Sequence, residues 1–204
     1  MSEVSAPDVM VEDQKLYMRQ MVRVKLRLEE ARHLLYKAKR DERDLLYATL
    51  QLRLAIEETA CASLVANRTS FDDGQRAFTL RKFEHVQKAL KALNPDYWPN
   101  GIFEESPQGG IPTVWTDNPD ALSGSEWMKM WGKLSERLHM RNPWEAHRDL
   151  SSDATFLRAV HSKLVRTLSS HIVTLVGGEH LVMARLWSTP VEVYIFTAVG
   201  PDPA

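Results

Sequence analysis

The side chains best suited to acid–base chemistry gather in one short segment, Arg137–His147, which holds two arginines and two histidines. Histidine titrates near neutral pH and can take the proton from a ribose 2′-hydroxyl. Arginine offers a fixed fork of donors to a phosphate as negative charge builds up. Arg141 and His147, with polar Asn142 after the arginine, are therefore candidates for metal-independent RNA cleavage. The alternative is a surface arginine and histidine around a helix end.

His139 is a second candidate histidine, two residues before Arg141. On an unbroken helix these two side chains would point about 200° apart. They can cooperate only if the helix ends between them, which Pro143 permits. Otherwise His139 is a helix-end residue that lies favourably against the helix dipole.

Five helical segments have the apolar periodicity needed to position these residues. Ser123-x-x-Glu126 has the form of a capping box at the start of the fourth segment, and Asp153 is the expected N-cap of the fifth. A short polar join between the first two segments favours an antiparallel pair, although one kinked helix is the alternative. The predicted helices cover residues 12–39, 41–67, 73–93, 123–142 and 153–170.

The rest of the chain has a different pattern. Residues 1–11 are expected to form a flexible tail. Residues 94–122 hold prolines, glycines and acidic side chains without periodicity, so we expect a long irregular acidic loop. Residues 171–204 are rich in β-branched and aromatic residues, and Gly177-Gly178 is a hairpin signal. The predicted fold is mainly α: a bundle of about five helices with a small C-terminal three-stranded antiparallel sheet packed on it.

Two features of this sequence resemble the HEPN superfamily. One is the Leu-Ala-Ile-Glu stretch at Leu54–Glu57, on an early helix, and the other is Arg141-Asn142 followed by His147. The resemblance covers residues 12–170. It implies a small helical bundle in which the arginine, the polar residue and the histidine form a metal-independent ribonuclease site, with His139 or Glu57 as supporting residues. It further implies a role as a toxin or in phage defence, an antitoxin or other protein partner, and an active site formed between two copies.

A row of basic residues on the first predicted helix is a candidate RNA-binding surface. Lys15, Arg19, Arg23 and Arg27 are spaced by four and share one helix face, as phosphate contacts would require. The alternative is a solvated helix face whose charges are used in local ion pairs, with Glu12 before Lys15 and Glu30 after Arg27. We refer to these four residues as the basic ladder.

The charge of the chain is balanced globally but not locally. The formal net charge is -1, yet residues 94–124 contain five acidic and no basic side chains. If this acidic stretch folds over the basic ladder, the ladder is structural; if it does not, the ladder is free to bind phosphate.

Composition limits the remaining function classes. One cysteine excludes an internal disulfide framework, and the sequence has no paired-cysteine or histidine motif for a metal and no glycine-rich nucleotide loop. We therefore expect no metal and no cofactor. Short apolar runs and an acidic N-terminus predict a cytoplasmic protein without a membrane segment. The long first two helices predict a homodimer. The hypothesis of a different class is a non-catalytic helical module for oligomerisation or partner binding.

Overall fold

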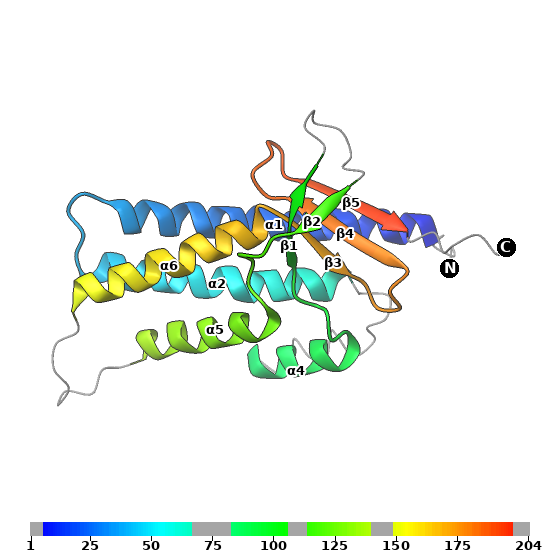
Figure 1. The fold of residues 1–204 in the computed structure, drawn as a ribbon. Coiled ribbons are helices and arrows are strands. Elements are labelled where there is room, and N and C mark those ends of the chain that lie inside the picture. The colour runs from blue at the N-terminus through cyan, green and yellow to red at the C-terminus, as the bar shows by residue number, and fades with distance from the viewer. Residues whose placement is uncertain (1–5, 67–82, 106–113, 140–148, 198–204) are drawn as a thin grey trace.

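The computed structural model describes residues 6–66, 83–105, 114–139 and 149–197. These residues form five helices and a sheet of five strands (Figure 1). The helices are α1 (Ala6–Tyr36), α2 (Glu42–Ala66), α4 (Phe83–Leu93), α5 (Gly124–Leu138) and α6 (Leu150–Leu168). The strands are β1 (Asn100–Glu104), β2 (Trp115–Asp117), β3 (Ser170–Thr174), β4 (His180–Arg185) and β5 (Glu192–Thr197).

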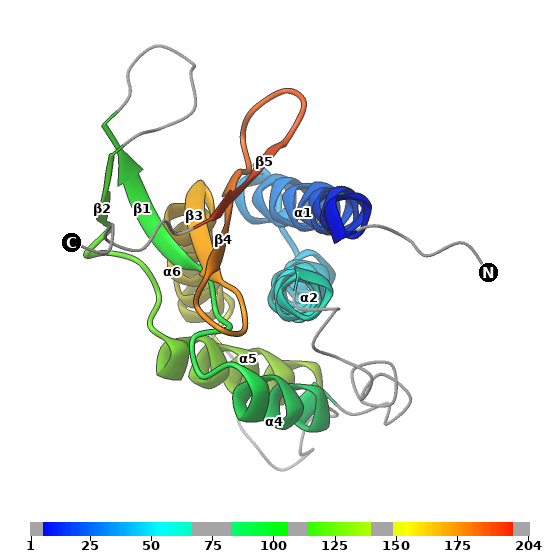
Figure 2. The same cartoon turned by 90° about the vertical axis from the view of Figure 1, so that its right-hand side faces the viewer.

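Helix α2 is the centre of the helical part. It pairs antiparallel with α1 and contacts α4, α5 and α6, and the sheet covers α1 and α6 (Figures 1 and 2). The prediction of two separate antiparallel helices at the N-terminal end is confirmed. None of the described helices combines the length and the apolar character that crossing a bilayer requires.

Two helices begin at residues other than those predicted, and the start of the predicted helix 73–93 lies outside the described residues. Helix α1 starts at Ala6, inside the segment expected to be a tail. Pro7 suggested a segment that is not helical. Proline is nevertheless tolerated in a first helical turn, where the backbone N–H has no partner within the helix. Helix α6 starts at Leu150 because Asp149 accepts hydrogen bonds from the backbone N–H groups of Ser151 and Ser152. Asp153, the expected N-cap, lies in the first turn.

The sheet has five strands, so the prediction of three was wrong. Strands β3, β4 and β5 form the expected C-terminal meander, but β1 and β2 come from the segment that we expected to be irregular throughout. All neighbours are antiparallel, in the order β2-β1-β3-β4-β5. The two additional strands are only five and three residues long, which is too short for an alternating pattern to be recognised.

Gly101 explains why a glycine lies inside β1. A Cβ atom at this position would be 2.9 Å from both the Cβ of Ala121 and the carbonyl oxygen of Thr167. The strand therefore passes directly against the end of α6, and only glycine leaves enough room.

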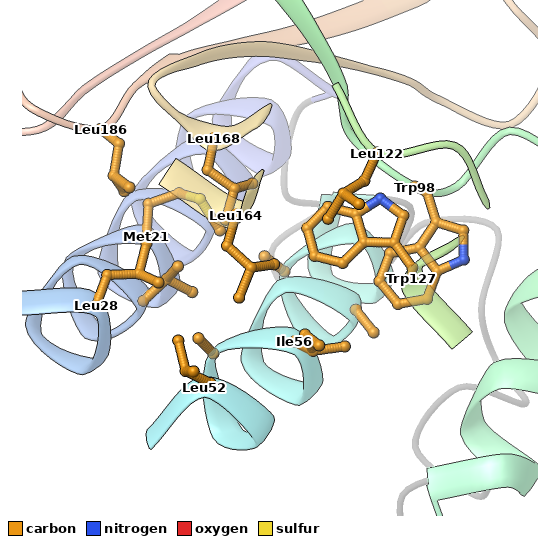
Figure 3. Close-up of a cluster of buried hydrophobic side chains, with 14 of the residues drawn as sticks. Met21, Leu28, Leu52, Ile56, Trp98, Leu122, Trp127, Leu164, Leu168 and Leu186 are labelled. Carbon is orange, nitrogen blue, oxygen red and sulfur yellow. The ribbon is translucent and has the colours of Figure 1, made fainter. Parts of the chain in front are cut away.

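One hydrophobic core joins the helices to the sheet (Figure 3). Met21 and Leu28 of α1, Leu52 and Ile56 of α2, and Leu164 of α6 meet in its centre. On the side of α5, the Trp98 ring stacks on Trp127 with centroids 4.9 Å apart and planes 5° from parallel. These aromatic rings are core side chains.

Candidate functional site

Arg141, Asn142 and His147 lie outside the described residues, in the connection from α5 to α6. The structure does place both ends of that connection. Helix α5 ends at Leu138, with His139 as its C-cap in an extended conformation, and Asp149 caps the start of α6. His139 is exposed at the helix end, as the interpretation of this residue as a helix-end histidine requires.

An arginine holds these two helix ends together. Nε of Arg137 lies 3.2 Å from Oδ1 of Asp153. The same guanidinium lies 3.8 Å from the centroid of the Phe156 ring and donates to the carbonyl of Lys133 at 3.0 Å. Since the side chains of Arg137 and Asp153 are only 23% and 17% exposed, the contact is partly protected from solvent. It fixes the end of α5 against the first two turns of α6.

The start of α5 is equally well defined. Ser123 donates from its backbone N–H to Oε2 of Glu126 at 2.9 Å, as the predicted capping box requires. This backbone hydrogen bond, together with those from Lys163 and the Ser123 hydroxyl, lowers the pKa of Glu126 to about 2. Glu126 therefore stays ionised and pairs with Lys163 of α6 at 2.9 Å.

Glu57, on the stretch that resembles the HEPN superfamily, contacts α5 through a tryptophan. Trp131 donates from Nε1 to Oε1 of Glu57 at 2.8 Å, and Arg53 donates to the same oxygen at 2.9 Å. The Arg53 guanidinium also lies 5.3 Å from the centroid of the Trp131 ring. Glu57 thus pairs with Arg53 of its own helix, and the indole of Trp131 links α2 to α5.

The basic ladder is divided by its partners. Lys15 pairs with Glu12 at 3.0 Å. Arg27 binds Gln51 at 3.0 Å and Glu58 at 3.3 Å, both on α2. Arg19 and Arg23 are exposed and have no hydrogen-bond or ion-pair partner among the described residues. Half of the ladder therefore serves local and interhelical pairing, and two arginines remain accessible.

Three of the five acidic residues between 94 and 124 have partners other than the basic ladder. Glu104 pairs with Arg185 of β4 at 2.6 Å, and Asp120 with Arg166 of α6 at 3.0 Å. Asp117 accepts from the side-chain amide of Asn100 at 2.7 Å. None of these carboxylates neutralises the basic ladder.

A groove between α1, α6 and the turn after β4 was not predicted. Its volume is about 540 Å³. It is lined by Leu28, Glu29, Arg32, His33, His161, Val165 and Trp187. These residues come from three separate parts of the chain, so no spacing within the sequence could bring them together.

A second hollow lies beside β1 and the start of α5. Its volume is about 310 Å³. It is lined by Pro95, Asp96, Trp98, Pro99, Asn100, Leu122, Ser123, Gly124, Ile172 and Thr174. Its lining contains one carboxylate and no histidine, lysine or arginine, so it lacks the cations and acid–base groups of the first groove.

Two buried histidines are neutral. Burial lowers the pKa of His161, and the charge of nearby Arg32 acts in the same direction. Burial also lowers the pKa of His171, to about 4. Nε2 of His161 lies 3.1 Å from the carbonyl oxygen of Leu28 and must be the donor, because a carbonyl only accepts. No group of three or more potential metal ligands occurs within the described ranges.

Comparisons with known proteins add no relative to this picture. No protein-family model, curated protein or solved structure matches the chain.

Proposed function

We propose that this protein is a metal-independent endoribonuclease of the HEPN type, acting in the cytoplasm as part of a toxin–antitoxin or phage-defence system. The observation that carries the proposal is the place of the candidate segment in the fold. The segment with Arg141, Asn142 and His147 joins α5 to α6, and Arg137 and Asp153 bind the two ends of these helices to each other. The helix ends on both sides of the segment are thus held together, which supports the proposal that its histidine and arginine act on one phosphate.

The chemistry needs one base, one acid and a stabiliser of negative charge. The imidazole of His147 takes the proton from the ribose 2′-hydroxyl, and the 2′-oxygen forms a bond to the adjacent phosphorus. Arg141 donates to the phosphate oxygens as their charge increases, and Asn142 orients the phosphate. The bond from phosphorus to the 5′-oxygen breaks, and that oxygen receives a proton from His139 or from water. The products are a 2′,3′-cyclic phosphate and a 5′-hydroxyl.

RNA cleavage by the purified protein in the presence of EDTA tests the proposal. We expect cleavage between about pH 5 and pH 9 with an optimum near the pKa of a histidine. His147→Ala and Arg141→Ala should each reduce the rate by about 10²-fold or more. His85→Ala, a change at an exposed histidine of α4, is the matched control and should leave the rate unchanged. RNA that stays intact at every pH contradicts the proposal.

A second candidate function, a self-associating helical module, is favoured by the outer face of α1. Val22 and Leu26 are 41% and 58% exposed there. Figure 2 shows that no described element covers the side of α1 that faces away from α2 and the sheet. In an antiparallel pair of α1 helices centred on Leu26, Arg23 of one copy lies opposite Glu29 of the other, since each is three residues from the centre. The face is thus complementary to itself in charge as well as apolar at its middle.

Light scattering after size-exclusion chromatography tests the second candidate. We expect a dimer that Leu26→Glu converts to a monomer. Leu150→Glu, at an exposed leucine of α6, should keep the dimer. A dimeric protein without ribonuclease activity supports the self-associating module and not the ribonuclease. A monomeric wild-type protein contradicts the self-associating module.

A further inference from the structure

Two pairs of a cation and an exposed aromatic ring flank the groove between α1 and α6; Trp187 lines the groove itself, and Lys25, Arg158 and Tyr36 lie beyond its lining. At one end, Nζ of Lys25 lies 5.7 Å from the centroid of the Trp187 ring. At the other end, the Arg158 guanidinium lies 5.1 Å from the centroid of the Tyr36 ring. Trp187 and Tyr36 are 38% and 60% exposed, so part of each ring is accessible beside its cation. Lys25 and Tyr36 are eleven residues apart on α1, which corresponds to about 16 Å along the helix.

Hydrogen bonds hold these end groups in place. Trp187 donates from its indole nitrogen to Oγ of Ser169 at 3.1 Å, and Lys25 donates to the carbonyl of Ser188 at 3.1 Å. Arg158 donates to the carbonyl of Leu35 at 3.1 Å, which satisfies an acceptor at the C-terminal end of α1. A ligand that binds here meets rings and charges that are already oriented, so less conformational entropy is lost on binding.

Between the two ends, the groove holds one arginine and one carboxylate. Arg32 and His33 are exposed in its wall and have no hydrogen-bond or ion-pair partner within the described parts of the chain. Glu29 is the one carboxylate among the lining residues. The lining is therefore formally neutral with its histidines uncharged, and Lys25 and Arg158, which contact the two exposed rings, add two positive charges beside it. An exposed arginine without an acidic partner is available for an anion.

We infer that the groove between α1 and α6 binds single-stranded RNA, with bases stacked on Trp187 and Tyr36 and phosphates bound by Lys25, Arg32 and Arg158. Aromatic rings that stack on bases, alternating with cations that follow the backbone, are the arrangement that single-stranded nucleic acids require. The inference rests on the proposed ribonuclease function, because Tyr36 is the last residue of α1, and α1 ends on the same side of the bundle as the end of α5 and the start of α6 (Figure 1). It also places the RNA on a different face of α1 from the accessible half of the basic ladder.

Fluorescence anisotropy with a labelled octauridylate RNA tests the groove without a cleavage readout. The full chain with His147→Ala is used so that the probe stays intact, and the deoxy analogue, which has no 2′-hydroxyl to attack, is measured in parallel. Three phosphate contacts predict a slope of about −2 for the logarithm of the binding constant against that of the salt concentration. UMP is the comparison ligand and should bind more weakly than the octamer.

Two exposed cations, Arg32 of α1 and Lys88 of α4, provide a matched pair of variants. Arg32→Gln should weaken binding about tenfold and reduce the salt slope by about 0.7, the contribution of one phosphate contact on a single strand. Lys88→Gln also removes one positive charge, outside the groove and the basic ladder, and should change binding less than twofold. Trp187→Ala should also weaken binding about tenfold, and Trp187→Phe, which keeps a stacking surface, should restore most of it.

The outcomes separate the groove from the ribonuclease proposal. RNA binding that depends on Arg32 and Trp187, in a protein that cleaves no RNA, supports the groove and contradicts the nuclease. Cleavage that is unaffected by both groove variants contradicts the groove and leaves the nuclease. Equal losses for Arg32→Gln and Lys88→Gln, UMP binding as tight as that of the octamer, or no RNA binding at low salt would each overturn the inference.

Discussion

The Tyr17 hydroxyl donates a hydrogen bond to Nε2 of His171 across 2.9 Å, in the fully buried contact between α1 and β3. The other ring nitrogen of His171 lies 3.0 Å from the carbonyl oxygen of Leu168. A carbonyl only accepts, so Nδ1 carries the proton and Nε2 is free to accept from the tyrosine. One tautomer of one histidine therefore links the first helix to the sheet, 154 residues further along the chain.

Removing that hydroxyl should destabilise the fold. Tyr17→Phe leaves Nε2 of His171 buried without a donor, and we expect a loss of about 1–3 kcal/mol in the free energy of unfolding. Urea denaturation followed by circular dichroism measures it. Tyr47→Phe is the matched control, because the Tyr47 side chain is 59% exposed, and its stability should equal that of the wild type. Equal stability of both variants would show that the buried hydrogen bond contributes nothing.

Stability should fall as the pH decreases from about 6.5 toward about 4. Burial lowers the pKa of His171 from 6.5 in the unfolded chain to about 4 in the folded protein. Its contribution is fully present above pH 6.5, and it is lost as the pH falls because the unfolded state binds the proton first. The expected loss at pH 5 is about 2 kcal/mol, and His161 adds to it with the same sign. Urea midpoints at pH 7.5 and pH 5 give the difference, which His171→Gln should reduce and His139→Gln should not.

Substitution by alanine should have opposite effects on stability at Gly101 and at Gly132. Gly101→Ala places a Cβ 2.9 Å from neighbouring atoms and should destabilise the protein by about 1–3 kcal/mol. Gly132 lies within α5, where an added Cβ meets no described atom within 4 Å. Gly132→Ala should therefore stabilise the protein by about 0.5–1 kcal/mol. Thermal unfolding midpoints that shift in the same direction would contradict this account of β1.

A largely buried ion pair between two strands should contribute much more to stability than an exposed ion pair at the surface of the protein. Arg185 of β4 binds Glu104 of β1 at 2.6 Å, and the two side chains are only 13% and 14% exposed. Arg185→Met leaves that carboxylate largely buried without its cation and should lower stability by about 3 kcal/mol. Arg166→Met removes an arginine whose pair with Asp120 is 57% and 64% exposed, so the expected loss is below about 1 kcal/mol. Similar unfolding midpoints for the two variants would refute the difference.

Apolar periodicity was sufficient to predict the helices because each buries a continuous stripe. The capping box at Ser123 and the ion pair of Arg53 with Glu57 were also recognisable, since their partners lie three and four residues apart. Strand β1 escaped prediction because its glycine and short length suggested a loop, and its pairing with β3 involves residues about 70 positions away. Local patterns contain no information about such a partner.

The same limit applies to the candidate sites. The basic ladder is visible in the sequence as a row of four basic residues. The partner of Lys15 lies one helical turn earlier on α1, but the partner of Arg27 lies on α2. The groove combines Arg32 of α1, His161 of α6 and the Trp187 turn, so only the folded chain brings it together. The prediction for Arg141 and His147 remains a sequence prediction.

The strand order has a consequence for the order of synthesis. Strand β1 lies between β2 and β3, and β3 is made only after α5 and α6. While the ribosome is still producing those helices, one edge of β1 has no strand to pair with, and the sides of α1 and α6 that the sheet covers are bare. A nascent chain at that stage exposes an unpaired strand edge beside apolar helix surfaces, a combination that invites aggregation. Chaperone dependence during translation should therefore end when β3 and β4 have emerged, and a pause in translation just after α6 should lower the yield of folded protein.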